Sequence, residues 1–173
     1  NQLENGVAGL VVNGTTAESP TLSKDEVKKL YTRARSLAGN STPIILGTGT
    51  NATQTTIENT QWAEGLGADA ALVVVPYYNK PPQSGLVEHF KAVANSSGLP
   101  IILYNVPGRT VAHLELESIV ELAKEKQIVA IKEATGDITF TELIKKHCPQ
   151  LTILSGDDPS CVAAMAKGAS GVI

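Results

Sequence analysis

Short apolar runs alternate with amphipathic stretches along the chain, which has 173 residues. The runs are rich in valine, isoleucine and leucine, a composition typical of buried strands. Between the runs, apolar residues recur at helical spacing, as Val27, Leu30, Tyr31 and Ala34 do in one stretch. The pattern predicts strands at residues 6–12, 43–46, 70–75, 100–104, 128–132 and 151–154, and a last strand beginning at residue 171.

Local signals mark where several predicted helices begin and end. Ser23 followed by Glu26 forms a capping box that opens one helix, and Gly39 ends it. Asp158 with Pro159 predicts an N-cap followed by proline at the first helical position. Strand and helix therefore alternate through the whole chain.

Alternating βα units with continuously apolar strands predict a parallel sheet covered by helices. We expect a (β/α)8 barrel rather than a doubly wound sheet, because no glycine-rich dinucleotide motif follows the first strand. Polar residues also follow nearly every strand, where a barrel has its active site. A complete barrel takes about 250 residues, so we expect residues 1–173 to be a single, incomplete barrel domain. It would lack the first strand and the end of the last unit, and its two open sheet edges would favour aggregation.

Composition excludes several functional classes. The chain is 42% hydrophobic and 18% charged, and its net charge of −3 without a basic run argues against nucleic-acid binding. No apolar stretch approaches the roughly 18 residues of a membrane span. Cys148 and Cys161 have no metal-site spacing and predict free thiols in a reducing compartment. We predict that His89, His113 and His147 are surface residues rather than ligands, and we expect no metal site.

The strand that ends at Lys132 is the most informative stretch for chemistry. A lysine at the end of an apolar strand is either an edge residue whose ammonium reaches solvent or a reactive amine held in place. Burial lowers the pKa of a lysine, and the neutral amine can attack a carbonyl group. The lysine alone does not decide between these interpretations.

The ends of the other predicted strands supply possible partners for this amine. Thr15 and Thr16 offer hydroxyl and backbone N–H groups to a small anion, although threonine is common in ordinary βα turns. Tyr104 can donate and accept a proton, and Arg109 offers a guanidinium fork for a carboxylate. An amine, a phenol and a carboxylate receptor at one barrel mouth suit Schiff-base chemistry on a keto acid.

Five segments occur in an order and spacing that resemble a known family. They are Gly-Thr-Thr-Ala-Glu-Ser (14–19), Pro-Tyr-Tyr-Asn-Lys-Pro (76–81), Tyr-Asn-Val-Pro-Gly-Arg-Thr (104–110), Ile-Lys-Glu-Ala-Thr-Gly-Asp (131–137) and Ser-Gly-Asp-Asp (155–158). The chain resembles the 4-hydroxy-tetrahydrodipicolinate synthase (dihydrodipicolinate synthase) family of pyruvate-dependent class I aldolases. The resemblance covers essentially the whole chain.

This resemblance implies a role for each candidate site residue. Lys132 matches the lysine that forms a Schiff base with pyruvate, and Tyr104 matches the general acid and base. Thr15 and Tyr78 match the rest of a proton relay, with the tyrosine reaching in from a neighbouring subunit. The remaining matches bind substrate: Thr16 and the backbone at Ile173 contact pyruvate, and Arg109 binds the carboxylate of aspartate semialdehyde.

The resemblance further implies a cytoplasmic homotetramer, a dimer of dimers, without a metal or organic cofactor. Its substrates would be pyruvate and L-aspartate-4-semialdehyde, in the first committed step toward diaminopimelate and lysine. One departure is Ala17, which stands where many members have glycine, and we expect it to be tolerated if its φ is negative.

Two alternatives remain open at this point. The nearest is a sister Schiff-base aldolase, such as N-acetylneuraminate lyase or a keto-deoxy-sugar-acid aldolase or dehydratase, which shares the lysine and the tyrosine. Arg109 and the pair Tyr77 and Tyr78 argue against the neuraminate lyase. The other is a non-catalytic barrel retained as a scaffold, which would be expected to lose the amine or the phenol.

The family resemblance also bears on feedback regulation. Many members bind lysine near the positions of Ser19, Asn51 and Tyr77, and in sensitive members two histidines and a glutamate complete the site. The matching positions here hold Lys24, Val27 and Thr55. We therefore expect the protein to be insensitive, or nearly so, to lysine.

Overall fold

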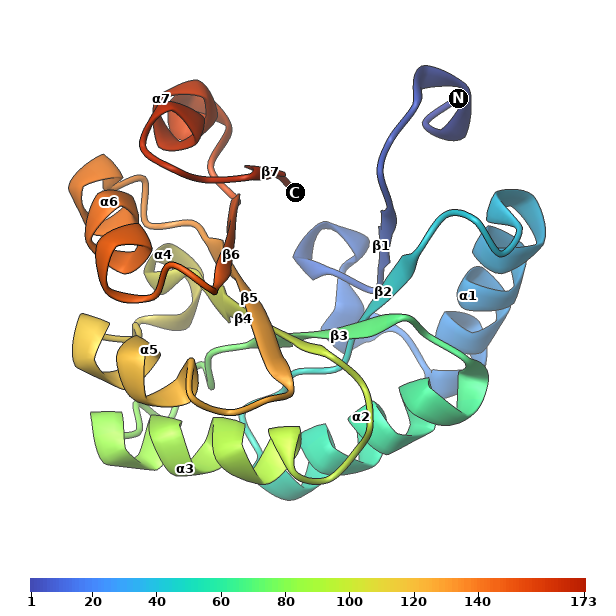
Figure 1. Ribbon diagram of the computed structural model, residues 1–173. Coiled ribbons are helices and arrows are strands. Elements are labelled where there is room, and N and C mark those ends of the chain that lie inside the picture. Colours follow the sequence, from blue (N-terminus) through green and yellow to red (C-terminus); the bar gives the residue numbers. More distant parts are fainter.

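The computed structural model describes residues 1–173 and contains one parallel sheet with seven strands in sequence order. The strands are β1 Leu10–Val12, β2 Ile44–Gly47, β3 Ala70–Val74, β4 Ile101–Asn105, β5 Ile128–Glu133, β6 Thr152–Ser155 and β7 Gly171–Val172. The sheet curls, with the helices on its outer side and with β1 and β7 at its two edges (Figure 1). This arrangement confirms the predicted incomplete (β/α)8 barrel.

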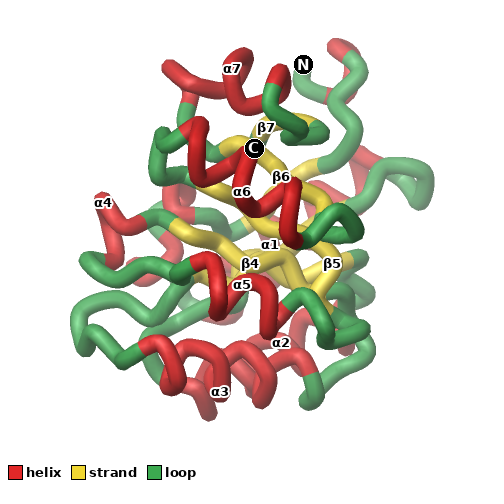
Figure 2. Tube along the Cα trace, turned by 60° about the vertical axis from the view of Figure 1, so that its left-hand side comes forward, coloured by secondary structure: helices red, strands yellow, loops and turns green.

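The structure has seven α-helices, of which the short α4 follows the carboxyl end of β4 and the others lie along the outside of the sheet (Figures 1 and 2). They are α1 Lys24–Ala38, α2 Thr53–Leu66, α3 Gln83–Ala94, α4 Pro107–Thr110, α5 Leu116–Leu122, α6 Ile138–His147 and α7 Cys161–Ala166. Four short 3-10 turns complete the regular structure: η1 Leu3–Asn5, η2 Thr15–Ala17, η3 Ser19–Thr21 and η4 Asp158–Ser160.

The predicted capping box of α1 is confirmed, whereas the predicted cap near residue 158 is wrong. The Glu26 backbone N–H donates to Ser23 Oγ over 3.3 Å, and the Ser23 N–H donates to a Glu26 carboxylate oxygen over 2.8 Å. Near the last helix the capping residue is Asp157, which accepts from the Ser160 N–H over 3.2 Å. The chain turns one residue earlier than predicted, because a 3-10 turn that begins at Asp158 precedes α7.

The first predicted strand, residues 6–12, is too long. Only Leu10–Val12 pairs with β2. Gly6 has a left-handed φ of 73° and its N–H closes the turn η1 on Leu3, so the chain cannot be extended there.

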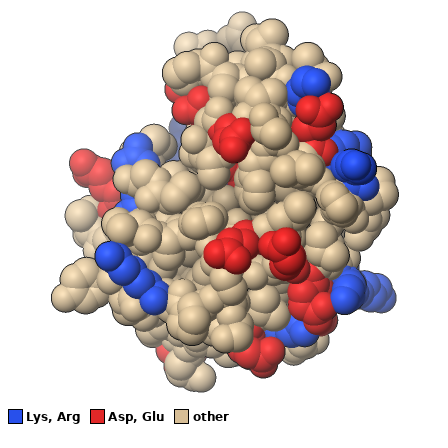
Figure 3. Space-filling view, turned by 90° about the vertical axis from the view of Figure 1, so that its left-hand side faces the viewer, with Lys and Arg blue, Asp and Glu red and all other residues tan.

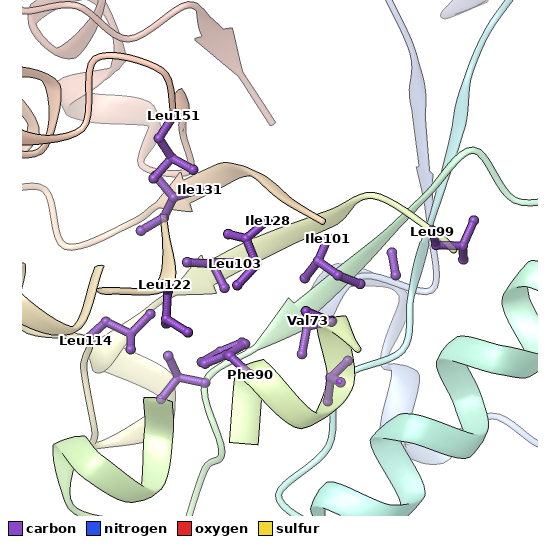
Figure 4. Packing of buried hydrophobic residues seen from close by; sticks show 14 of the residues in the cluster. Val73, Phe90, Leu99, Ile101, Leu103, Leu114, Leu122, Ile128, Ile131 and Leu151 are labelled. Carbon is purple, nitrogen blue, oxygen red and sulfur yellow. The ribbon is translucent and has the colours of Figure 1, made fainter. Parts of the chain in front are cut away.

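Apolar side chains alternate across the sheet and form two cores. The larger core lies between the sheet and the helices, where Phe90 of α3 packs near Val73, Leu103 and Leu122 (Figure 4). The smaller core faces the inside of the curl and consists of Ala70, Leu72, Ile102, Tyr104, Val106 and Ala130. Successive residues of a strand therefore face the helices or the barrel interior in turn.

One of the three histidine predictions is wrong. His113 and His147 are exposed, but His89 of α3 is buried. Its Nδ1 lies 2.9 Å from Thr53 Oγ1 at the start of α2, and burial lowers the pKa of its imidazole to about 4. A hydroxyl partner on the neighbouring helix lets a neutral imidazole occupy this interface.

Cys148 and Cys161 are free thiols, as predicted, and burial raises the pKa of Cys148. None of the helices is both long enough and apolar enough to cross a membrane. Lys and Arg side chains are scattered on the face shown in Figure 3 and form no continuous basic patch there.

Candidate active site

Lys132 and Tyr104 lie side by side at the carboxyl ends of two neighbouring strands. Strands β4 and β5 pair in parallel with Tyr104 opposite Lys132. Lys132 Nζ lies 4.5 Å from the centroid of the Tyr104 ring. Because Tyr104 belongs to the core inside the curl, both side chains face the barrel interior. The amine and the phenol predicted from the sequence are thus brought together.

The surroundings of Lys132 favour its neutral form. Burial lowers the pKa of the amine, the positive charge of Arg109 lowers it further, and the negative charge of Asp158 partly opposes both. Desolvation and a like charge both penalise the ammonium ion. A neutral amine is the form that attacks a carbonyl carbon, so this environment suits a nucleophilic lysine.

Gly156, directly after β6, leaves the space that the Lys132 side chain occupies. A Cβ atom at residue 156 would lie 2.6 Å from Lys132 Cε and 3.0 Å from the Ala134 Cβ. These contacts are closer than van der Waals separation, so any larger residue would displace the end of the lysine. The sequence motif containing Gly156 does not by itself reveal this role.

The family resemblance implies a reducible pyruvate adduct on Lys132, and on that basis we predict that Gly156→Ala slows its formation by about 100-fold, because displacing a reacting group by about 1 Å costs on this order. The rate is measured by borohydride trapping and mass spectrometry. Gly65→Ala in α2 is the matched control, because nothing lies within 4 Å of its added Cβ. A Gly156→Ala protein that forms the adduct at the unmodified rate would contradict this account.

A pocket of about 270 Å³ opens beside Tyr104 at the same end of the sheet. Thr15, Tyr77, Tyr104 and Arg109 line it, together with Lys24 at the start of α1. Arg109 and Lys24 are its only charged lining residues, and no aspartate or glutamate lines it. The pocket therefore suits a ligand that carries carboxylate groups.

Lys132 lies beside Tyr104 but is not among the residues that line this pocket, and Thr16, Tyr78 and Ile173 also lie outside its lining. Thr16 is exposed in the turn η2. Tyr78 is 86% exposed and has a left-handed φ of 76° in the loop after β3. Ile173 follows β7, and its backbone N–H donates to Ser155 O over 2.9 Å. The pocket thus brings together Thr15, Tyr104 and Arg109 of the predicted set, whereas Tyr78 extends into solvent.

The turn that carries Thr15 accommodates Ala17 without strain. Left-handed φ values in this region fall on Asn13 (60°) and Glu18 (55°), not on Ala17. Gly47 of β2 fits against the same turn: its added Cβ would lie 2.0 Å from Asn13 O. The turn therefore needs glycine at residue 47, a requirement that sequence analysis missed.

Asn105 and Glu133 form a buried pair directly behind the amine and the phenol, and sequence analysis missed this pair too. Asn105 is fully buried and Glu133 is 4% exposed. Asn105 Nδ2 donates to Glu133 Oε2 over 2.8 Å. Burial raises the pKa of Glu133, while hydrogen bonds from Thr135 and Asn105 oppose that rise. The available signal was two polar residues at the ends of otherwise apolar strands.

The structure contains no group of three or more His, Cys, Asp or Glu side chains placed to hold a metal ion. The polar groups at the mouth are an amine, hydroxyls and a guanidinium, which are not the carboxylate and imidazole ligands that such ions prefer. What these groups suit chemically is addition of an amine to a carbonyl group and binding of carboxylates.

The architecture is that of a barrel enzyme family whose members keep their sites at this end of the strands. The model of the Dihydrodipicolinate synthetase family matches residues 1–173, and the chain belongs to this family. A 4-hydroxy-tetrahydrodipicolinate synthase of Bdellovibrio bacteriovorus is 54% identical over 99% of this chain and 59% of its own length. The chain thus spans about three fifths of that relative.

Solved structures give the same result. The chloride-inhibited dihydrodipicolinate synthase of Acinetobacter baumannii, solved as a complex with pyruvate, is 45% identical and superposes with a TM-score of 0.96. The match covers 99% of this chain and 59% of that one. The enzyme of Cyanidioschyzon merolae, solved with lysine bound, is 41% identical with a TM-score of 0.94, over 98% of this chain and 58% of that one.

Proposed function

We propose that this chain is the catalytic barrel of a 4-hydroxy-tetrahydrodipicolinate synthase that condenses pyruvate with L-aspartate-4-semialdehyde. The observation that carries the proposal is the partly buried amine of Lys132, 4.5 Å from the Tyr104 ring centroid, with a lowered pKa. Pyruvate in the A. baumannii structure and the names of the relatives support the choice of substrates. The product would enter diaminopimelate and lysine biosynthesis in the cytoplasm.

In the proposed mechanism, the neutral Lys132 amine adds to the keto carbon of pyruvate, and water leaves as the imine forms. Loss of a methyl proton then gives an enamine, whose carbon attacks the aldehyde carbon of the second substrate and restores the imine. The amino group of the second substrate then adds to the imine carbon, the bond from that carbon to Lys132 breaks, and the cyclic product leaves with the lysine amine restored. Tyr104 and Thr15 would transfer the protons, since both line the pocket and offer hydroxyl groups. No metal or organic cofactor takes part in this scheme.

The remaining residues would bind substrate and complete the relay. Arg109 would hold the carboxylate of aspartate semialdehyde, and Thr16 and the backbone at Ile173 would contact pyruvate. Tyr78 would complete the proton relay of a neighbouring subunit in a homotetramer. Its exposure of 86% supports a role outside its own barrel.

A substrate panel tests the proposal. Purified protein is given pyruvate with aspartate semialdehyde or with sugar aldehydes, and the product is followed in each case. We expect turnover with aspartate semialdehyde and a single reduced pyruvate adduct after borohydride treatment. Preference for sugar aldehydes would indicate a sister aldolase, and absence of any adduct would indicate a non-catalytic barrel.

Feedback inhibition by lysine is expected to be weak. Lys24 and Val27 line the pocket near Tyr77, and no carboxylate lines it to bind the ammonium of a lysine ligand. Loss of a charge-assisted hydrogen bond and gain of the like charge of Lys24 should weaken lysine binding at least ~10-fold relative to a sensitive member. Activity is measured at saturating pyruvate with increasing L-lysine.

Half-inhibition at sub-millimolar lysine would contradict this prediction. A variant that combines Lys24→His, Val27→His and Thr55→Glu provides the comparison, because it supplies the carboxylate and removes the like charge. We expect this variant to gain sensitivity to lysine.

A further inference from the structure

We propose that the buried pair of Asn105 and Glu133 positions Tyr104 and Lys132 for the reaction through hydrogen bonds in which every donor meets an acceptor. The inference rests on the proposed function, because it concerns residues that act through the amine and the phenol. Asn105 is fully buried and Glu133 is 4% exposed, and the strand register directs both away from the side of the sheet that carries Tyr104 and Lys132. They are therefore positioning residues rather than catalytic ones.

The pair lies one residue beyond the reactive pair on the same two strands. Tyr104 is opposite Lys132 in the pairing of β4 and β5, and Asn105 is opposite Glu133. Consecutive strand residues face opposite sides of a sheet, so Asn105 and Glu133 are buried on the helix side. A shift of this pair would therefore move the backbone that carries the amine and the phenol.

The hydrogen bonds lie between two fixed backbone donors and converge on the Glu133 carboxylate. At one end, the Leu114 N–H donates to Asn105 Oδ1 over 3.0 Å. In the middle, Asn105 Nδ2 donates to Glu133 Oε2 over 2.8 Å. At the other end, the Thr135 N–H donates to Glu133 Oε1 over 2.6 Å. The two side chains must therefore present an acceptor at each end and one donor–acceptor contact between them.

These contacts also join the segments around the mouth. Leu114 follows α4, the helix that carries Arg109, and Thr135 belongs to the loop between β5 and α6. The Ala134 N–H donates to Asn105 O over 2.9 Å, which ties that loop to β4 as well. The pair thus links the lysine strand, the tyrosine strand and the segment that presents the arginine.

Burying a carboxylate between two strands costs free energy of desolvation. An apolar pair of similar volume can often replace such a polar pair without loss of stability. What a polar pair adds is a single allowed arrangement, because each donor must face an acceptor. At this position, that arrangement fixes the amine beside the phenol ring, 4.5 Å from its centroid, and small displacements of reacting groups slow a reaction.

The test exchanges the hydrogen-bonding groups of the pair. Glu133→Gln places an amide N–H₂ against either Asn105 Nδ2 or the Thr135 N–H, and Asn105→Asp places two carboxylates together. The double variant N105D/E133Q restores every contact. Its new aspartate accepts from Leu114 N–H and from the new glutamine, whose amide oxygen accepts from Thr135 N–H. The double variant also keeps the charge of the original pair.

The measured quantity is the rate constant of reducible pyruvate adduct formation on Lys132 at saturating pyruvate, well below the melting temperature of each variant. We expect each single substitution to lower this rate constant by at least ~10-fold, and the double variant to recover to within about threefold. The pyruvate concentration that gives half the maximal rate should stay unchanged, because neither residue contacts the pocket. A role in stability alone would lower the melting temperature and leave the rate constant of the folded protein unchanged.

Single variants that fold and form the adduct at the unmodified rate would overturn the proposal. If neither single variant folds, the comparison of N105D/E133Q with the apolar double variant N105L/E133L decides the question. An apolar pair that folds and reacts at the unmodified rate would exclude a role for the matched hydrogen bonds, whereas a folded but slow apolar pair supports it. Absence of an adduct in the unmodified protein would count against the proposed function itself.

Discussion

Replacing Lys132 with arginine is expected to abolish the reducible pyruvate adduct and to lower turnover by at least about 10⁴-fold, the order of loss seen when a nucleophile is removed. Arginine has a similar length, but its guanidinium does not lose its proton in proteins. The substitution therefore removes the nucleophilic amine and leaves a long side chain beside the Tyr104 ring. Borohydride trapping followed by peptide mapping measures the adduct directly.

The control for this substitution is Lys146→Arg, because Lys146 is exposed at the end of α6. It should keep both the adduct and the turnover.

In the unmodified protein, adduct formation should become faster as the pH rises toward the pKa of Lys132, since the neutral fraction of the amine increases. Because burial and Arg109 lower that pKa, the rate should level off below the usual lysine range. An adduct mapped to any other lysine would contradict the assignment.

The strands and most helices could be predicted because their physical causes are local in sequence. A parallel strand covered on both faces is apolar throughout, so runs such as Ile101–Leu103 mark it without knowledge of its neighbours. The start of α1 follows from the reciprocal hydrogen bonds of Ser23 and Glu26. Lys132 and Tyr104 could be predicted as a pair because the carboxyl ends of parallel strands meet at one end of a barrel.

The features that escaped prediction depend on contacts between distant segments. The burial of His89 requires the Thr53 hydroxyl, which lies 36 residues away in the chain. The need for glycine at residue 156 comes from the Lys132 side chain on the neighbouring strand. The role of Glu133 depends on Asn105, 28 residues earlier. The pattern of neighbouring residues in the sequence cannot reveal such requirements. Each requirement depends on which residue of a distant segment lies opposite in the folded chain.

The second large effect is expected from Tyr104→Phe, which removes a single hydroxyl group from the mouth. The phenylalanine ring keeps the packing of a side chain that is 5% exposed, and it keeps the face over which Lys132 Nζ lies. The stability of the protein and the position of the amine should therefore change little. Proton transfer is lost, and a positioned acid or base contributes about 10²–10⁴-fold to a rate. We expect turnover to fall by that factor.

Single-turnover measurements separate the two steps in which Tyr104 would take part. In Tyr104→Phe, the pyruvate adduct should still form on Lys132, but more slowly, because the amine itself is intact. Tyr31→Phe is the matched control: Tyr31 is as deeply buried, on α1, and its hydroxyl accepts only from Arg35 over 3.4 Å. It should leave turnover within about twofold of the unmodified protein, as expected for a change away from the reacting groups. Equal turnover in Tyr104→Phe and Tyr31→Phe would mean that another group transfers the proton, and Thr15, whose residue also lines the pocket, would then be the candidate to test.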